Sequence, residues 1–386
     1  MERQFPALDE SVGSITAASF KRRLDEGEEW TLLDTRPTSA FEQWRISHPN
    51  VTAVNVPFTA FLDENGEPAD SVPEGVPDEQ LVTCCAKGIS SRYVAEFLAR
   101  EGWDVRAIDD GMEGWARLDE LRHIETGPDL DAVQFHRPSS GCLAYLLVSD
   151  GEAAVIDPLR AFAGEYVEQA HKRGATLRYA IDTHVHADHV SGVRAVAAES
   201  EAEVVVPERA QDRGATFDGR FVADGDTLTL GETSIDVVGL PGHTTEMTGY
   251  RIGELLLTGD SLFLDSVARP DLEDEDAARE AATQLWETRQ QFAALPDETI
   301  IGPGHVGPTT APSSDGTYTA RLGSLRQALD AFEDDREGFI ERVTANLPPR
   351  PNNYEEIIAL NLGQQSATDE ETFELELGPN NCAVDG

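Results

Sequence analysis

The most constraining feature of the sequence is a dense group of metal-binding side chains between residues 184 and 189. The segment Thr183-His184-Val185-His186-Ala187-Asp188-His189 follows the strand-like run RYAID. Imidazoles two residues apart, with a carboxylate and a third imidazole just beyond, can converge on a cation at the end of a strand. The segment is therefore expected where a strand gives way to a loop and then a helix.

Three further candidate ligands each follow a strand-like run of their own. His243 lies in Pro-Gly-His-Thr, Asp260 in Thr-Gly-Asp and His305 in Gly-Pro-Gly-His. Together with the 184–189 segment, these patches hold five of the nine histidines of the chain, which indicates a shared metal centre. The other histidines are expected to be ordinary core or surface residues: His48, His123, His136 and His171.

Length, composition and charge limit the class of protein. A chain of 386 residues that is 40% hydrophobic and 7% aromatic fits two ordinary globular domains. The net charge of −42 disfavours nucleic acid and anionic membranes as partners. Salt screens such self-repulsion, so we expect a halophilic protein from a salt-rich cytoplasm like that of haloarchaea; an acidic mesophilic protein is the alternative.

The cysteines and the N-terminal residues predict a cytoplasmic location. Cys84, Cys85, Cys142 and Cys382 have no disulfide-like spacing, which is typical of a reducing compartment. The sequence MERQFPALDE lacks the basic and apolar parts of a signal peptide. No apolar run approaches the roughly 18–20 residues that span a bilayer. A soluble protein follows from these observations.

Secondary-structure patterns predict an α/β chain of two domains. Residues 30–34, 51–57 and 80–84 resemble buried strands and residues 91–101 an amphipathic helix, which implies a parallel sheet. The polar segment with Gly127-Pro128 resembles a linker. We predict domains over 1–127 and 128–365, followed by an acidic tail over 366–386. Short strands separated by turns and helices in the second domain would fit two sheets sandwiched by helices.

A cysteine-containing loop in the first domain is a second candidate site. Thr83-Cys84-Cys85-Ala-Lys-Gly-Ile-Ser-Ser91-Arg92 follows a β-run and opens a helix. Backbone N–H groups of such a loop can point at Cys85 and stabilise a thiolate or persulfide anion. Cys84 is expected to be a small buried hydrophobe. Cys142 and Cys382 lie in no motif that assigns them a role.

The first domain resembles the rhodanese family over residues 12–120. The resemblance rests on Cys-x-x-Gly-x-x-Ser, on Asp34-Thr-Arg36 and on Asp110-Gly-Met-Glu-Gly-Trp115. The stretch that is usually Gly-His-Ile-Pro-Gly is Trp44-Arg-Ile-Ser-His48 here. The family implies that Cys85 accepts sulfur. It also implies that the surrounding loop includes Lys87, Gly88, Ser91 and Arg92. An inactive docking module is the alternative.

The second domain resembles the metallo-β-lactamase superfamily over roughly residues 130–345. The order His-x-His-x-Asp-His, Gly-His, Gly-Asp and Gly-His carries the resemblance, which implies an αββα sandwich. Similarity to the persulfide dioxygenase branch is seen in the segment THVHADHVSG, in residues 258–272 and in the stretch from Leu347 to Leu362. That branch implies one Fe(II) held by His184, His243 and Asp260. Two imidazoles and one carboxylate leave positions open for persulfide and dioxygen, as in non-haem iron oxygenases.

Glyoxalase II-like thioester hydrolases share several of these patches and give the alternative. In that case His186, Asp188, His189 and His305 would complete a site for two zinc or iron ions, with Asp260 as the bridge. The dioxygenase resemblance also makes Arg269 and Asp271 possible contacts for an anionic thiol. A structural salt bridge explains this pair equally well.

The two resemblances together imply sulfide oxidation or detoxification. We predict that a low-molecular-weight thiol persulfide is oxidised to sulfite with O2, coupled to sulfurtransfer by Cys85. Expected partners are the persulfide, O2, and thiosulfate or sulfite, and a homo-oligomer is expected. A third possibility is a sulfur-carrier or docking protein. The thiol carrier and the direction of sulfur transfer stay open.

Overall fold

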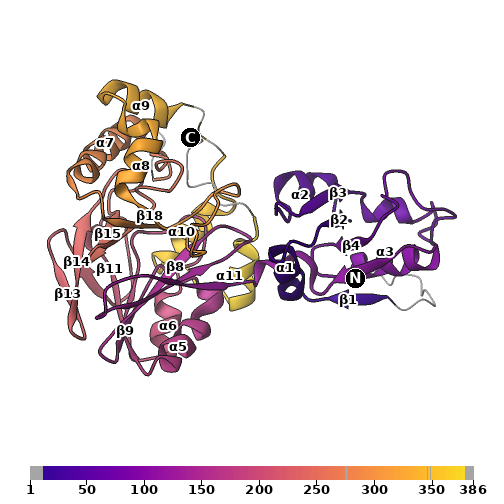
Figure 1. Ribbon diagram of the computed structural model, residues 1–386, viewed down its shortest axis with the longest axis horizontal. Coiled ribbons are helices and arrows are strands. Elements are labelled where there is room, and N and C mark those ends of the chain that lie inside the picture. Colours follow the sequence, from indigo (N-terminus) through magenta and orange to yellow (C-terminus); the bar gives the residue numbers. More distant parts are fainter. Residues whose placement is uncertain (1–11, 274–276, 346, 348, 379–386) are drawn as a thin grey trace. The chain divides into compact units, whose positions relative to one another are not determined.

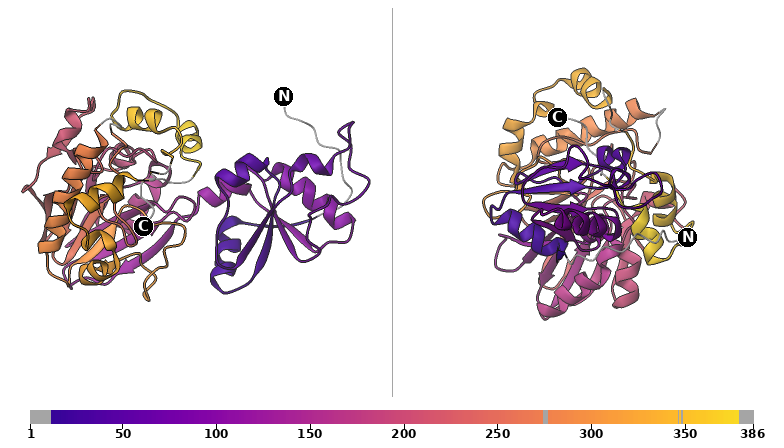
Figure 2. Two further views of the ribbon diagram at one scale, coloured as in Figure 1. Left: turned by 90° about the horizontal axis from the view of Figure 1, so that it is seen from above. Right: turned by 90° about the vertical axis from the view of Figure 1, so that its right-hand side faces the viewer.

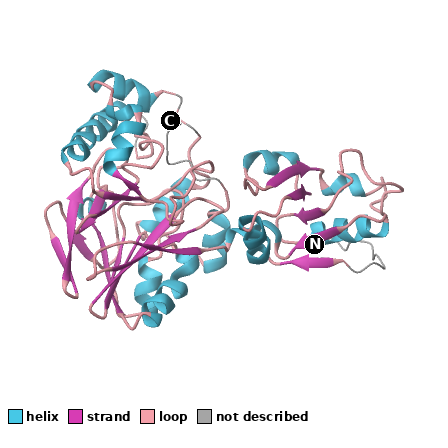
Figure 3. Cartoon of the chain, viewed as in Figure 1, coloured by secondary structure: helices cyan, strands magenta, loops and turns pink. Residues whose placement is uncertain are grey.

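The computed structural model describes residues 12–273, 277–345, 347 and 349–378. The chain divides into two compact units: one comprises the residues up to Leu118 together with Pro138–Ser140, and the other comprises Asp119–Arg137 and the residues from Gly141 onward (Figure 1). Both units contain strands and helices (Figure 3). None of the helices in the described residues has the length and apolar character needed to cross a membrane.

The first unit is built on a five-stranded parallel sheet with the order β1-β5-β4-β2-β3. Its strands are β1 (Gly13–Ile15), β2 (Trp30–Asp34), β3 (Val51–Asn55), β4 (Leu81–Cys84) and β5 (Val105–Ile108). Its helices are α1 (Ala17–Asp25), α2 (Thr38–Gln43), α3 (Ile89–Arg100) and α4 (Gly111–Ala116), with a 3-10 turn η1 (Phe58–Phe61). The predicted strands and the predicted helix are all present, with ends that differ by at most two residues.

Apolar residues on both faces of the strands explain why helices cover this sheet on two sides (Figure 2). Successive side chains of a strand point to opposite faces. Leu32 therefore packs in one cluster with α1 and α4, and Leu33 packs in the other with α3. Cys84 is fully buried in the first cluster, as expected of a small core hydrophobe.

The second unit contains two sheets. The seven-stranded sheet has the order β12-β11-β10-β9-β8-β7-β6 and the six-stranded sheet the order β13-β14-β15-β16-β17-β18. The first sheet comprises β6 (Glu120–Ile124), β7 (Asp131–His136), β8 (Leu143–Ser149), β9 (Glu152–Ile156), β10 (Thr176–Ile181), β11 (Glu203–Pro207) and β12 (Arg220–Val222). The second comprises β13 (Thr227–Leu230), β14 (Thr233–Gly239), β15 (Thr248–Ile252), β16 (Leu255–Gly259), β17 (Ile300–Pro303) and β18 (Ala320–Arg321).

The helices of this unit pack on the outer faces of the sheets, except for the last two, which pack against the loop after β10. They are α5 (Ala163–Lys172), α6 (Val193–Glu199), α7 (Ala278–Ala294), α8 (Leu322–Ala328), α9 (Arg336–Thr344), α10 (Tyr354–Asn361) and α11 (Asp369–Leu375). Short 3-10 turns are η2 (Arg160–Phe162), η3 (Glu208–Gln211) and η4 (Asp330–Phe332). One apolar cluster joins α5 and α6 to the first sheet, and another joins α7, α8 and α9 to the second.

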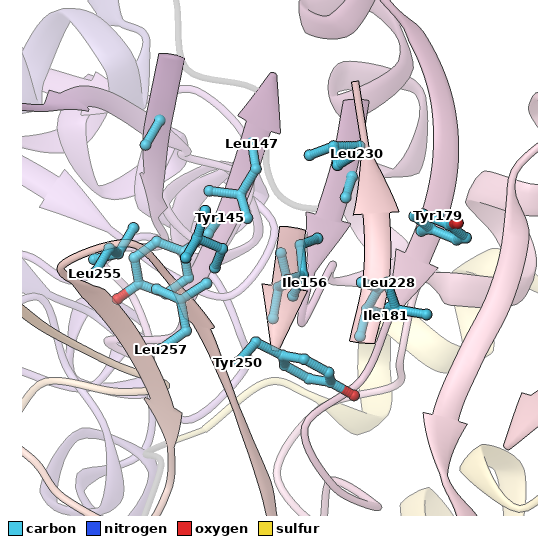
Figure 4. Close-up of a cluster of buried hydrophobic side chains, with 14 of the residues drawn as sticks. Tyr145, Leu147, Ile156, Tyr179, Ile181, Leu228, Leu230, Tyr250, Leu255 and Leu257 are labelled. Atoms are coloured by element: carbon cyan, nitrogen blue, oxygen red, sulfur yellow. The ribbon is translucent and has the colours of Figure 1, made fainter. Parts of the chain in front are cut away.

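The main core lies between the two sheets. Tyr145, Leu147 and Ile156 of the first sheet share one cluster with Tyr250 and Leu257 of the second (Figure 4). With helices outside both sheets, the unit is an αββα sandwich. The structure therefore confirms the predicted fold class, a parallel α/β domain followed by an αββα sandwich.

The structure moves two predicted boundaries. The sequence pattern places residues 120–124 in the first domain, whereas β6 pairs antiparallel with β7 at the edge of the second unit's sheet. An edge strand with partly exposed side chains is polar enough to resemble a linker. The predicted tail begins at 366, but α11 is a helix capped by Thr368, with Phe373 only 2% exposed. Cys382 lies outside the described residues.

Replacing Leu257 by alanine tests the core between the sheets. Leu257 is 1% exposed, and Leu257→Ala should lower the free energy of unfolding of the second unit by about 2–5 kcal/mol because it leaves a cavity. Ile89, which is 64% exposed, supplies the control, since Ile89→Ala should change stability by less than about 0.5 kcal/mol. Urea unfolding measures both, and equal effects of the two variants would contradict the assignment.

Candidate metal centre

The histidine-rich loop follows β10, which is an interior strand of the seven-stranded sheet. β10 pairs in parallel with β9 on one side and β11 on the other. The loop that follows, residues 182–192, has no regular secondary structure and is buried throughout, and α6 begins directly after it. This is the strand–loop–helix arrangement that the sequence predicts, and it places several imidazoles inside the protein.

Three of the predicted ligands meet in one buried group: His184, His243 and Asp260. Their candidate ligand atoms all lie within 4.8 Å of one another. The Nε2 atoms of His184 and His243 lie 3.8 Å and 3.5 Å from the Asp260 Oδ2 atom. At most 2% of any of these residues is exposed. The group offers two imidazole nitrogens and one carboxylate oxygen to a single point.

Hydrogen bonds on the far side of each ligand fix its orientation. His243 donates through Nδ1 to the Arg269 carbonyl at 2.9 Å. The Thr183 hydroxyl donates to Asp157 at 2.9 Å, so it accepts from His184 Nδ1, which lies 2.9 Å away. Both imidazoles are therefore protonated on Nδ1 and present an unprotonated Nε2.

Two ligand atoms of this group are buried polar atoms without a partner. Among the described residues, His184 Nε2 and Asp260 Oδ2 make no hydrogen bond. Leaving such atoms unpaired is costly, and each one in a native structure needs an explanation. A cation held between His184, His243 and Asp260 would satisfy both atoms. The donor set therefore fits the metal ion that the fold implies.

The protonation states also suit a metal centre. Burial and the neighbouring His186 imidazole hold the pKa of His184 well below its usual range. Burial likewise lowers the pKa of His243. Burial opposes ionisation of Asp260, but His305 overcomes this and lowers the pKa of that carboxyl group. Neutral imidazoles and an ionised carboxylate are the forms that bind metal ions.

A second buried group adjoins the first and consists of Cys142, Asp188, His189 and His305. The Asp188 Oδ2 atom lies 2.9 Å from His305 Nε2, 3.0 Å from His189 Nδ1 and 3.3 Å from the Cys142 Sγ atom. The His305 Nδ1 atom lies 2.6 Å from Asp260 Oδ1. Although burial opposes it, the carboxylates of Asp260 and Asp188 raise the pKa of His305 well above its usual range. His305 thus links the two groups.

His186 belongs to neither of these two groups. Its Nε2 atom lies 3.3 Å from Asp157 Oδ1 and 3.7 Å from Asp182 Oδ1. Burial opposes protonation, but the Asp157 carboxylate contributes to raising the pKa of His186 to about 9. Sequence reasoning grouped His186 with Asp188, His189 and His305 as one possible second-metal set. The structure brings the last three together, while His186 is placed with Asp157 and Asp182, although its ring also lies 4.2 Å from those of His184 and His189.

Three residues of these groups have no place in the sequence prediction: Cys142, Asp157 and Asp182. Asp157 and Asp182 each end an apolar strand run, AAVID and RYAID, which is a signal that could have identified them. Cys142 precedes β8, which is antiparallel to β9 and begins at the edge where β9 ends. Only the pairing of those strands reveals that Cys142 lies beside the histidine-rich loop, residues 182–192, which we call the metal loop.

Arg269 and Asp271 form a buried bidentate ion pair. The Arg269 Nε and Nη2 atoms donate to Asp271 at 2.8 Å and 2.9 Å, and a third bond goes to the Pro349 carbonyl at 2.9 Å. Because the Arg269 carbonyl accepts the His243 hydrogen bond, this pair supports the backbone behind a candidate ligand. The salt bridge that the sequence left open as one reading of this pair is present.

The cysteine loop of the first unit lies between β4 and α3. Gly88, with φ of 75°, precedes the helix in the left-handed conformation that glycine tolerates. Cys85 is 4% exposed, and Ser91 Oγ donates to its Sγ atom at 3.3 Å. Lys87 and Arg92 are exposed and pair with acidic residues, Lys87 with Glu113 at 3.0 Å and Arg92 with Glu96 at 3.4 Å.

Comparison with protein families agrees with this geometry. The rhodanese-like domain model matches residues 16–118, and the metallo-beta-lactamase superfamily model matches residues 137–305. The chain is a rhodanese-like domain followed by a metallo-beta-lactamase domain. Its α/β unit is thus the rhodanese-like domain, and its αββα sandwich is the metallo-beta-lactamase domain.

Curated proteins of similar sequence include hydroxyacylglutathione hydrolases. The chain is 27% identical over 212 residues to a hydroxyacylglutathione hydrolase of Erythrobacter litoralis, a match that covers 54% of the chain and 72% of that protein. A hydroxyacylglutathione hydrolase of Xanthomonas campestris is 33% identical, over 42% of the chain and 58% of its own length. Thus the chain spans less than two thirds of the Xanthomonas relative.

Solved structures similar to this chain include one of ETHE1 and one of a metallo-beta-lactamase. ETHE1 from Myxococcus xanthus is 26% identical with a TM-score of 0.53, covering 60% of this chain and 97% of that one. A metallo-beta-lactamase from Staphylococcus aureus is also 26% identical, with a TM-score of 0.57, covering 62% and 74%.

Paired glutamine variants test which histidines hold the metal. His243→Gln removes an imidazole from the first group and should weaken metal binding at least about tenfold. His186→Gln should leave metal affinity within about threefold of the original, because the Gln side chain still reaches Asp157 and no ligand of the first group changes. Metal analysis after anaerobic loading and dialysis measures both. Equal loss of metal in the two variants would place His186 among the ligands.

Proposed function

We propose that the metallo-beta-lactamase domain is a non-haem iron dioxygenase that oxidises a low-molecular-weight thiol persulfide to sulfite. The observation that carries the proposal is the convergence of His184, His243 and Asp260, whose candidate ligand atoms all lie within 4.8 Å of one another in a buried position. Two imidazoles and one carboxylate with open positions are the ligand set of non-haem Fe(II) oxygenases. The alternative two-metal site would also use His186, whose Nε2 atom lies 3.3 Å from Asp157 Oδ1 and 3.7 Å from Asp182 Oδ1.

The residues of the site would hold the ion and keep it dry. Fe(II) bound there would supply adjacent coordination positions for a persulfide sulfur and for dioxygen. His184 and His243 present fixed, unprotonated nitrogens, and Asp260 brings one negative charge. His305 holds the other oxygen of Asp260 and so orients that carboxylate. Since the three ligands are at most 2% exposed, water reaches them poorly.

The overall reaction balances with one O2 and one water for each persulfide. A thiol persulfide, O2 and water give the free thiol, sulfite and two protons. The sulfane sulfur is oxidised and O2 is reduced. The similarity to ETHE1 from Myxococcus xanthus fits the persulfide dioxygenase branch that the sequence motifs resemble.

The second candidate function is thioester hydrolysis. The curated relatives named hydroxyacylglutathione hydrolases favour it, as does the group of Cys142, Asp188, His189 and His305, which offers ligands for another cation. Such an enzyme would require two zinc or iron ions and no oxygen. The two functions therefore differ in metal content and in the co-substrate consumed.

Oxygen uptake distinguishes the two functions. Iron-loaded protein in high-salt buffer, supplied with a thiol persulfide, should consume O2 and form an equal amount of sulfite at about one iron per chain. An oxygen electrode, sulfite analysis and metal analysis on the same sample give the result. Hydrolysis of a hydroxyacyl thioester without O2 uptake, at about two metals per chain, would establish the hydrolase instead. The His243→Gln variant is the control for adventitious iron.

For the rhodanese-like domain, we propose that Cys85 carries sulfane sulfur between the thiol persulfide and sulfite or thiosulfate. In one direction the Cys85 thiolate attacks the outer sulfur of the thiol persulfide, so that a Cys85 persulfide forms and the thiol leaves. Sulfite then attacks that outer sulfur, which gives thiosulfate and restores the thiolate. The Ser91 hydroxyl, which donates to Cys85 Sγ at 3.3 Å, stabilises the thiolate state.

Cysteine variants test this role. Cys85→Ser should abolish sulfur transfer between thiosulfate and a thiol or cyanide acceptor, because a serine hydroxyl forms no persulfide. Cys84→Ala should keep most of the transfer, since Cys84 is fully buried in the apolar core. Transfer rates with matched protein concentrations supply the measurement. Unchanged transfer by Cys85→Ser would refute the role, whereas O2 uptake by the other domain should be the same in both variants.

A further inference from the structure

The backbone of the metal loop is buried without the support of a regular ladder. Residues 182–192 form neither helix nor sheet, apart from one isolated bridge at Ser191. Buried backbone N–H and C=O groups are nearly always paired in folded proteins. Because strands supply few partners here, side chains of other elements must supply the rest. One such side chain is Glu246, whose Oε1 atom accepts from the Val185 N–H at 3.0 Å.

Asn361, at the end of α10, makes three hydrogen bonds to this loop. Its Nδ2 atom donates to the carbonyls of His186 and His189, both at 2.9 Å. Its Oδ1 atom accepts from the Ser191 N–H at 2.8 Å. The residue is only 7% exposed, so water competes little for these bonds. One amide thus fixes the path of the chain between two histidines whose rings point to different groups.

Glu376, directly after α11, holds the next backbone group. Its Oε1 atom accepts from the Val190 N–H at 2.9 Å, and its Oε2 atom accepts from the Arg137 guanidinium at 2.7 Å. Both side chains are at most 2% exposed. The Arg137 guanidinium also lies over the ring of Phe373 in α11. The carboxylate is therefore locked in place by an ion pair while it holds the loop.

We propose that Asn361 and Glu376 are positioning residues of the metal centre. Both come from the chain beyond residue 345, outside the segment 137–305 that matches the superfamily model. Together they hold backbone groups of His186, His189, Val190 and Ser191, in the same loop that carries His184. The role concerns metal binding and stands whether the domain is a dioxygenase or a hydrolase.

Removing the amide donors should change the metal centre itself. In Asn361→Asp a carboxylate oxygen faces the carbonyls of His186 and His189, so the loop must move. We expect Co²⁺, used as a probe, to bind 10–100-fold more weakly, in the range found when groups that orient metal ligands are lost. The ligand-field absorption spectrum at saturation should also differ from that of the original protein, because the ligand geometry has changed.

Asn55 provides a matched control in the rhodanese-like domain. It also donates through Nδ2 to two carbonyls, those of Asp34 at 2.9 Å and Arg36 at 3.0 Å. Asn55→Asp introduces the same chemical change far along the chain from any metal ligand. It should leave Co²⁺ affinity and the Co²⁺ spectrum unchanged, even if it lowers the melting temperature.

Two further variants keep the test decisive. Asn361→Ser removes both amide donors without adding charge and should give the same direction of change if Asn361→Asp does not fold. Glu376→Gln keeps an acceptor for Val190 and should weaken Co²⁺ binding less than Asn361→Asp. If the Asn361 variants melt earlier but bind Co²⁺ with the original affinity and spectrum, the residue is only structural and the proposal is overturned.

Discussion

The metallo-beta-lactamase domain depends on burying a polar, irregular loop at the ends of parallel strands. Residues 182–192 carry three imidazoles and two carboxylates into a core where unpaired polar groups are costly. The αββα sandwich solves this because β9, β10 and β16 end at the same edge. Asp157 and Asp260 follow two of those strands and supply carboxylates to the loop.

The positions of the carboxylates determine which histidines belong to which buried group. The Nε2 atom of His186 lies 3.3 Å from Asp157 and 3.7 Å from Asp182, which places His186 in a group with these two carboxylates. His305 lies between Asp260 and Asp188 and links the two ligand groups. One oxygen of Asp260 is thereby held by an imidazole and the other stays open to a cation. The same His-x-His-x-Asp-His motif can therefore form different metal centres, depending on which acidic residues follow the neighbouring strands.

The sequence predicts local features well because they depend on neighbouring residues. Apolar runs predict β2, β4 and β10, and the resemblance to the persulfide dioxygenase branch implies that His184, His243 and Asp260 come together. The sequence does not predict features that depend on pairing between distant segments, because no local pattern records which strand or helix becomes a neighbour. β6 resembles a linker until it pairs with β7. The remaining partners of the metal loop come from strand starts and from helices after residue 345: Cys142, Asn361 and Glu376.

Burial and charge together restrict what can reach the two sites. Cys85 is 4% exposed and the three metal ligands are at most 2% exposed, so little of either site is open to solvent. Persulfides, sulfite and thiosulfate are small anions, and the chain carries a net charge of −42 that repels them. At about 1 M salt the Debye length falls to about 3 Å, which removes most of this repulsion. Association of anionic sulfur compounds should therefore become faster as salt rises, the opposite of the usual trend for an enzyme that attracts its anionic substrate.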